Sequence, residues 1–175
     1  MPLTKLNSAS VIERLPVGSV LQTKQSVQNL FLDLVCSGSN LTDITGLSVS
    51  ITPTSTSSQI LITYSINVGY YHNFNGIGFV LCKGSTAITN AVGNASGRGN
   101  RQPVTTSGGG VNGYHMSAET FAFLDSPATT SAITYAVKCN NNGGSVSPSY
   151  INRSSYGSPF GGNPSSTLIA MEIAQ

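Results

Sequence analysis

Charged residues are scarce in this sequence. Lys, Arg, Asp and Glu together make up 8% of the 175 residues, about a third of the ~25% of an average soluble domain. A chain so poor in charge can be disordered, but disordered segments usually combine low hydrophobicity with a high net charge. Here hydrophobic residues make up 39% of the chain and the formal net charge is +2. We therefore expect one folded domain with a polar but neutral surface.

Runs of basic residues and long apolar runs are also lacking. Only Arg98 and Arg101 lie close together among the 8 basic residues, whereas nucleic-acid binding needs a clustered basic face. No segment has the ~18 consecutive apolar residues of a membrane span. The stretch 1–16 has no uninterrupted apolar core of the kind found in secretory signals. We expect a protein that binds no nucleic acid and enters no membrane.

Cysteine is rare and has no metal-binding spacing. Cys36, Cys82 and Cys139 are far apart, whereas zinc sites use closely spaced pairs such as Cys-x₂₋₄-Cys. Cys36 and Cys82 end the apolar runs "FLDLVC" and "GFVLC" and resemble small buried hydrophobic residues. We favour free thiols, as in a protein assembled in a reducing cytoplasm. One disulfide with a leftover thiol is the alternative.

The motifs of common enzyme classes are missing as well. His72 and His115 are not in an HExxH arrangement, and no GxSxG or GxxxxGK[ST] motif is present. A pair of carboxylates for glycoside hydrolysis would have to come from only 6 acidic residues. We expect no enzyme activity, no metal and no cofactor.

What the sequence does contain is a strong alternation of apolar and polar residues. In the stretch 44–71 the expected buried positions are Ile60, Ile62, Tyr64, Ile66 and Val68. Alternate residues of a strand share one face of the sheet, so these five side chains should lie together in the core or at an interface.

Similar short runs recur along the chain, separated by Gly-, Pro- and Ser-rich turns. They are "FLDLVC" (31–36), "ITGLSVSI" (44–51), "GIGFVLCKG" (76–84), "AETFAFLDS" (118–126), "SAITYAVKC" (131–139) and "STLIAMEIAQ" (166–175). Many short strands without helices predict an all-β sandwich or barrel. We favour an antiparallel jelly-roll β-sandwich over residues 17–175, since its two packed sheets protect the edge strands. The segments 91–113 and 140–165 should be long loops.

Residues 1–16 lack a clean period and are interpreted as an arm that leaves the domain and docks on a neighbouring chain. The alternative is an N-terminal strand of the same sheet. The apolar residues that would attach the arm to a particle are Leu3, Leu6, Val11, Ile12 and Leu15.

Several blocks of the sequence resemble a module of virion proteins from tailed bacteriophages, especially phages of marine and cyanobacterial hosts. The blocks are "LPVGSVLQ" (15–22), "TDITGLSVSITPTSTSSQILI" (42–62), "FVLCKGSTAI" (79–88) and "STLIAMEIA" (166–174). The strand order is also similar to the trimeric jelly roll of tumour necrosis factor. The resemblance implies a homotrimer, assembled in the cytoplasm of the host bacterium and carried in the virion.

The chain departs from tail-fibre relatives because no shaft, heptad or collagen-like repeat precedes the module. This favours a capsid decoration (cement) protein that contacts the major capsid protein or another virion protein. The alternative is a tail-fibre or tail-tip protein that recognises the host and binds a surface glycan through the long loops.

A group of aromatic residues has two interpretations. Tyr70, Tyr71, Phe74 and Phe79 could form a glycan platform, since aromatic rings offer flat contact area. They could also belong to the core or to a subunit interface, which is the interpretation we favour.

Overall fold

The strands account for almost all regular structure in the described part of the chain. The computed structural model describes residues 15–36, 40–70, 77–96, 102–108, 115–141, 147–156 and 162–175. The strands are β1 (Val20–Gln28), β2 (Leu32–Cys36), β3 (Thr42–Ile51), β4 (Gln59–Tyr70), β5 (Ile77–Lys83), β6 (Thr86–Ala87), β7 (Thr106–Gly108), β8 (Met116–Asp125), β9 (Ile133–Asn141), β10 (Ser147–Ile151) and β11 (Ser166–Ile173). One short 3₁₀ turn, η1 (Thr89–Ala91), lies between β6 and β7. The prediction of an all-β protein is confirmed.

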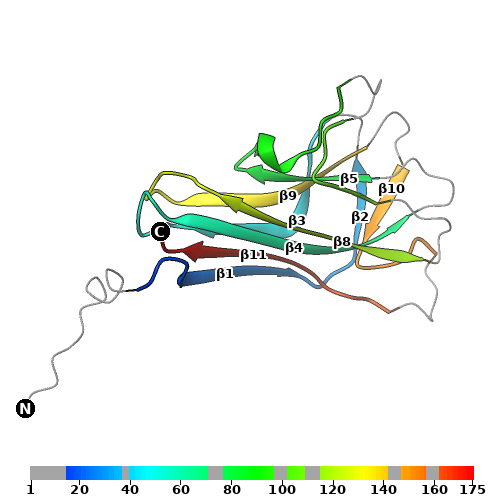
Figure 1. The fold of residues 1–175 in the computed structure, drawn as a ribbon. Helices are drawn as coiled ribbons and strands as arrows, with labels where there is room; N and C mark the ends of the chain where they lie inside the picture. The colour runs from blue at the N-terminus through cyan, green and yellow to red at the C-terminus, as the bar shows by residue number, and fades with distance from the viewer. Residues whose placement is uncertain are drawn as a thin grey trace, which may run out of the picture.

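The strands form two stacked antiparallel sheets (Figure 1). In the larger, six-stranded sheet, one edge of β4 pairs with β8. The other edge of β4 pairs with β11 and, further along, with β10. Strand β11 pairs in turn with β1, and β10 pairs with β2. The smaller, five-stranded sheet has the order β3-β9-β5, followed by β6 and β7.

The chain changes sheet repeatedly, as a jelly-roll sandwich requires. It passes from β2 in the larger sheet to β3 in the smaller one, back to β4, and across again to β5. Later it crosses from β8 to β9 and returns to β10 and β11. The predicted antiparallel jelly-roll β-sandwich is therefore the observed fold.

The core fills the space between the two sheets. The alternating residues of β4 supply much of it, and the structure places all five on the inward face. Their exposed fractions are 0% for Ile60, 1% for Ile62, 3% for Tyr64, and 0% for both Ile66 and Val68. Phe79 and Leu81 of β5, both 0% exposed, face them from the smaller sheet.

Two expected loops contain short strands. The segment 140–165 includes β10, and the segment 91–113 includes β7, so the prediction that both were loops throughout is wrong. The sequence "SPSYI" of β10 has a proline and no alternation that marks a strand. It is extended because β2 and β4 pair with it from either side.

The first and last strands meet at one end of the sandwich. The backbone N–H of Gly18 donates to Ala174 O at 2.8 Å, and the N–H of Ala174 donates to Ser19 O at 2.9 Å. Gly18 has a φ of +90°, which a residue without Cβ adopts at little cost. Gly18 and Ser19, just before β1, therefore lie beside Ala174 (Figure 1), whereas β4 and β9 end at the opposite end.

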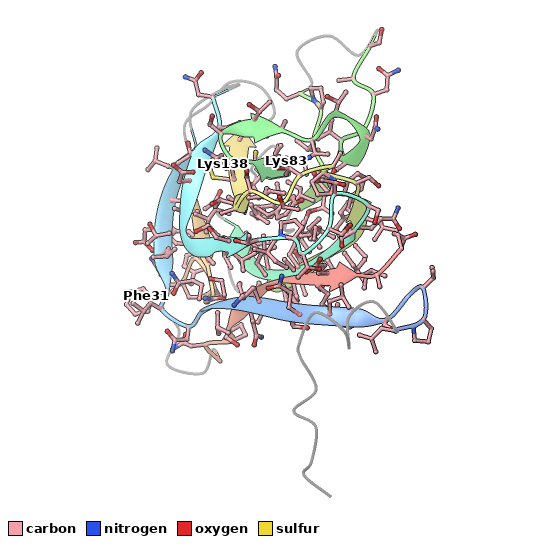
Figure 2. All side chains as sticks on the ribbon, turned by 90° about the vertical axis from the view of Figure 1, so that its left-hand side faces the viewer. Phe31, Lys83 and Lys138 are labelled. Carbon is pink, nitrogen blue, oxygen red and sulfur yellow. A yellow bond between two sulfur atoms is a disulfide. The ribbon has the colours of Figure 1, made fainter. Side chains whose placement is uncertain are left out.

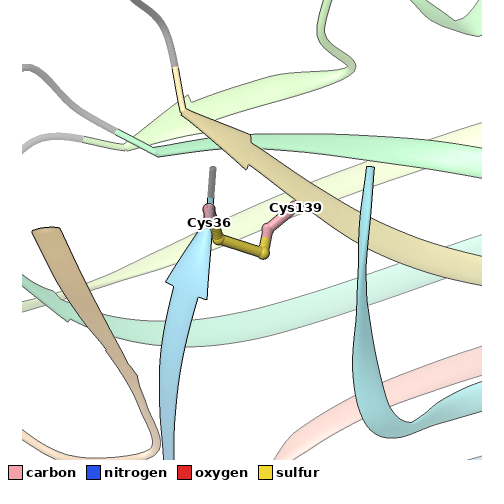
Figure 3. The surroundings of a disulfide bond; sticks show 2 residues. All are labelled: Cys36 and Cys139. Atoms are coloured by element: carbon pink, nitrogen blue, oxygen red, sulfur yellow. A yellow bond between two sulfur atoms is a disulfide. The ribbon is translucent and has the colours of Figure 1, made fainter. Parts of the chain in front are cut away.

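A disulfide joins the two sheets near that opposite end. Cys36 closes β2 and pairs with Cys139 of β9, with the two Cα atoms 6.3 Å apart (Figure 3). The expectation of free thiols is wrong for this pair, because the fold brings together two cysteines 103 positions apart. Cys82 is free and buried. Burial raises the pKa of its thiol to about 11.

Candidate assembly surface

The outer face of the larger sheet carries a continuous uncharged surface. Strand register places its side chains in three rows across β1, β11, β4 and β8. The rows are Thr23, Met171, Leu61 and Leu124, then Gln25, Ile169, Thr63 and Ala122, then Val27, Thr167, Ser65 and Thr120. None of these twelve side chains is charged. We call them the neutral face.

Alternation within each strand produces this face, since the neighbours of the buried residues must point outward. In β4 the outward residues are Leu61, Thr63 and Ser65, which alternate with the core isoleucines. In β8 the inward residues include Phe121, whose ring centroid lies 6.1 Å from that of Tyr64. The opposite side of β8 is left with Thr120, Ala122 and Leu124.

Two ion pairs lie away from the neutral face. Lys83 Nζ lies 2.6 Å from Asp125 Oδ2, and Lys138 Nζ lies 2.8 Å from Asp43 Oδ1. Figure 2 shows both lysines at the smaller sheet. Asp125 also accepts a 2.6 Å hydrogen bond from the hydroxyl of Tyr135. Burial and this carboxylate raise the pKa of Tyr135 far above its ordinary value.

One carboxylate is fully buried between the sheets. Glu172 of β11 is 0% exposed. It accepts 2.7 Å hydrogen bonds from Gln22 Nε2 and from both the backbone N–H and the hydroxyl of Thr54. Burial raises the pKa of Glu172, but these hydrogen bonds and one from Ser58 outweigh burial and leave the pKa below its ordinary value. The charge is therefore stabilised by neutral donors.

The predicted site residues are distributed as follows. Leu15 is 39% exposed at the start of the described chain, and Leu3, Leu6, Val11 and Ile12 lie outside the described residues. Phe79 is 0% exposed, so it cannot belong to a glycan platform.

The other members of the aromatic group are not placed by the structure. Tyr71 and Phe74 lie outside the described residues. Tyr70 ends β4, and its side chain is outside them too.

The neutral face was missed from the sequence because its rows join residues up to 148 positions apart. A signal was present in β4 and β11, where uncharged residues separate the buried ones. Only the register shows that the four strands lie next to one another.

Within the described residues, no helix is long and apolar enough to cross a membrane. No three His, Cys, Asp or Glu side chains of that part gather as metal ligands.

Comparison with known proteins gives distant likenesses only. No family model matches the chain, and no curated protein matches it. A chain in the structure of infectious bursal disease virus Gt strain is 13% identical with a TM-score of 0.45, covering 100% of this chain and 41% of that one. A chain from the Gx strain is 14% identical with a TM-score of 0.42, covering 90% and 37%. This chain thus spans about two fifths of those chains, and likenesses at this level transfer no role to it.

Proposed function

We propose that the protein is a structural component of a tailed-bacteriophage virion that assembles with itself through the neutral face. The observation that carries the proposal is the absence of charge from all twelve side chains of that face. Cores of protein interfaces are depleted in charged residues, and homo-oligomer interfaces are more apolar than other surfaces. The resemblance to virion modules supports a closed trimer, although closed dimers are commoner in general.

Within this class we propose a capsid decoration protein. The chain that follows Leu15 enters the domain beside the C-terminal end, as the hydrogen bonds of Gly18 and Ser19 with Ala174 show. An arm formed by residues 1–16 would leave from this end and reach the major capsid protein, while the opposite end of the sandwich faces away. Burying a few apolar side chains at ~25 cal/mol per Å² offsets the entropy of ordering the arm. Three arms on one trimer would bind with avidity.

A tail-fibre or tail-tip role is the second candidate. The same arrangement supports it, because the end opposite Leu15 would then point away from the particle, toward a host surface. The two roles differ in where the protein is attached to the particle, and electron microscopy of labelled protein on intact particles distinguishes them.

Self-association through the neutral face is tested by placing a charge at its centre. Thr63 lies between Ala122 and Ile169, so Thr63→Lys would bury an unpaired charge in the assembled form. We expect light scattering to show a trimer for the natural protein and a monomer for this variant. The matched control is Thr134→Lys, which adds the same charge to an exposed position of the smaller sheet. A natural protein that is monomeric at micromolar concentration, or a Thr63→Lys variant that remains a trimer, would contradict the proposal.

A further inference from the structure

The corner where β1 passes into β2 exposes two adjacent large apolar side chains. Leu30 is 67% exposed and Phe31 63%. Figure 2 shows Phe31 at the margin of the molecule, pointing away from it. Single exposed apolar residues are ordinary, but a contiguous group commonly marks a binding surface.

An arginine is fixed beside this group. The guanidinium carbon of Arg153 lies 4.2 Å from the ring centroid of Tyr150 and 5.8 Å from that of Phe31. Its Nε and Nη2 donate to Asp33 Oδ1 at 2.9 and 2.7 Å, and Nη1 donates to Ser154 O at 3.3 Å. A planar guanidinium held by stacking and by forked hydrogen bonds has little freedom left.

The backbone of Arg153 and Ser154 packs closely against β4. Gly69 of β4 pairs with Tyr150, and a Cβ at Gly69 would collide with the carbonyl oxygen of Arg153 and lie 2.9 Å from the Cα of Ser154. The absence of a side chain at Gly69 allows the segment 153–154 to cross the outer face here.

A buried asparagine holds the turn that presents Phe31. Asn152 is 0% exposed and has a φ of +63°, a conformation that Asn tolerates better than most residues. Its Nδ2 donates to Gln28 O at 2.7 Å and to Leu30 O at 3.0 Å. Its Oδ1 accepts a 2.6 Å hydrogen bond from the hydroxyl of Ser166. The turn before Phe31 is thus tied to the sheet by a buried network, and the corner is preorganised.

One polar acceptor of the corner has no partner among the residues that the structure describes. Both hydrogen bonds that Arg153 donates to Asp33 end on Oδ1, and the Asp33 side chain is 58% exposed. Within the described residues, Oδ2 is therefore left for a further donor beside the exposed ring. Because Arg153 and Asp33 form an ion pair, the corner as a whole is neutral.

We propose that this corner binds a neutral saccharide. A pyranose ring has an apolar C–H face that can stack on Phe31, and hydroxyl groups at its edge that can donate to Oδ2 of Asp33. One or two sugar rings match a single aromatic ring and a carboxylate, whereas a stable protein interface takes about 20–30 residues on each side. The zero net charge of the ion pair selects against charged ligands.

Binding to one such corner will be weak, because the site is shallow. The proposed trimer would carry three copies and strengthen attachment to a polysaccharide by avidity. Only this gain in affinity from avidity rests on the proposed function, because it requires the trimer. Binding at a single corner does not require assembly and can be measured on the Thr63→Lys monomer as well.

The proposal is tested by saturation-transfer NMR with neutral tetrasaccharides of glucose, mannose and galactose. We expect at least one of them to bind, Phe31→Trp to retain binding, and Phe31→Leu to weaken it at least about tenfold, since leucine keeps apolar area but has no flat ring. Asp33→Asn should have the same effect, since its amide still accepts from Arg153 but replaces Oδ2 with a donor. The control Val17→Ala shortens another exposed residue, 74% accessible, and should bind normally.

Several results would overturn the proposal. One is no binding of any tetrasaccharide at about 10 mM, a concentration that reveals even millimolar affinities. Another is undiminished binding by both Phe31→Leu and Asp33→Asn. A third is a change of oligomeric state in Phe31→Leu, which would assign the corner to contacts between copies. Thermal melts verify that each variant is folded. If Phe31→Leu does not fold, the binding of Phe31→Trp and of Asp33→Asn tests the proposal instead.

Discussion

Reduction of the Cys36–Cys139 disulfide should destabilise the protein strongly. The bond links β2 of the larger sheet to β9 of the smaller one and closes a loop across a sequence separation of 103. Both cysteines are at most 1% exposed and belong to the core. Breaking the bond therefore frees a long loop in the unfolded chain while leaving the native contacts largely in place.

The magnitude follows from the size of the loop. In the chain-entropy description, a cross-link that closes a loop of about 100 residues stabilises the folded state by about 4.7 kcal/mol. Losses measured on removing native disulfides are typically about 2–5 kcal/mol. Each kcal/mol shifts the melting temperature of a domain of this size by about 2–4 °C. We expect the melting temperature to fall by about 4–20 °C on reduction.

The assay is thermal unfolding of one protein, with and without reductant, so that no core side chain differs between the two measurements. A Cys82→Ala background removes the free thiol, which could otherwise exchange with the disulfide. Mass spectrometry verifies the oxidation state before each measurement. Coincident unfolding curves for the verified oxidised and reduced forms would refute the reasoning, and a chain that never forms the bond would refute the pairing.

Two further predictions concern the arm and the buried carboxylate. Deleting residues 1–15 should leave a folded trimer with nearly unchanged melting that no longer binds particles lacking the protein; full occupancy by the deleted form, counted by electron microscopy, would favour the tail role. Because the pKa of Glu172 is lowered in the folded state, its contribution to stability is present above the unfolded pKa of ~4.3 and is lost as pH falls through the folded pKa. Melting temperatures between neutral and acidic pH should therefore fall less steeply for Glu172→Gln than for the natural protein, and parallel curves would contradict the assignment.

The sequence alone determined the class of fold and the inward face of the central strand. Ile62, Tyr64 and Ile66 alternate with the polar residues Thr63, Ser65 and Asn67, and this period is a local property that any extended chain converts into two faces. The scarcity of charge and the Gly- and Ser-rich turns likewise indicated an all-β sandwich without reference to tertiary contacts. The short strand β10 was missed because its sequence has no such period.

The tertiary structure decided which residues from distant parts of the chain lie together. Cys36 meets Cys139, and Phe31 meets Arg153, only because strands β2, β9 and β10 are placed by pairing across the fold. The neutral face depends in the same way on the register of four strands. Register is set by the packing of both sheets on one core, a cooperative property of the whole chain. No local sequence pattern specifies this register. The two candidate surfaces could therefore be recognised only in the folded protein.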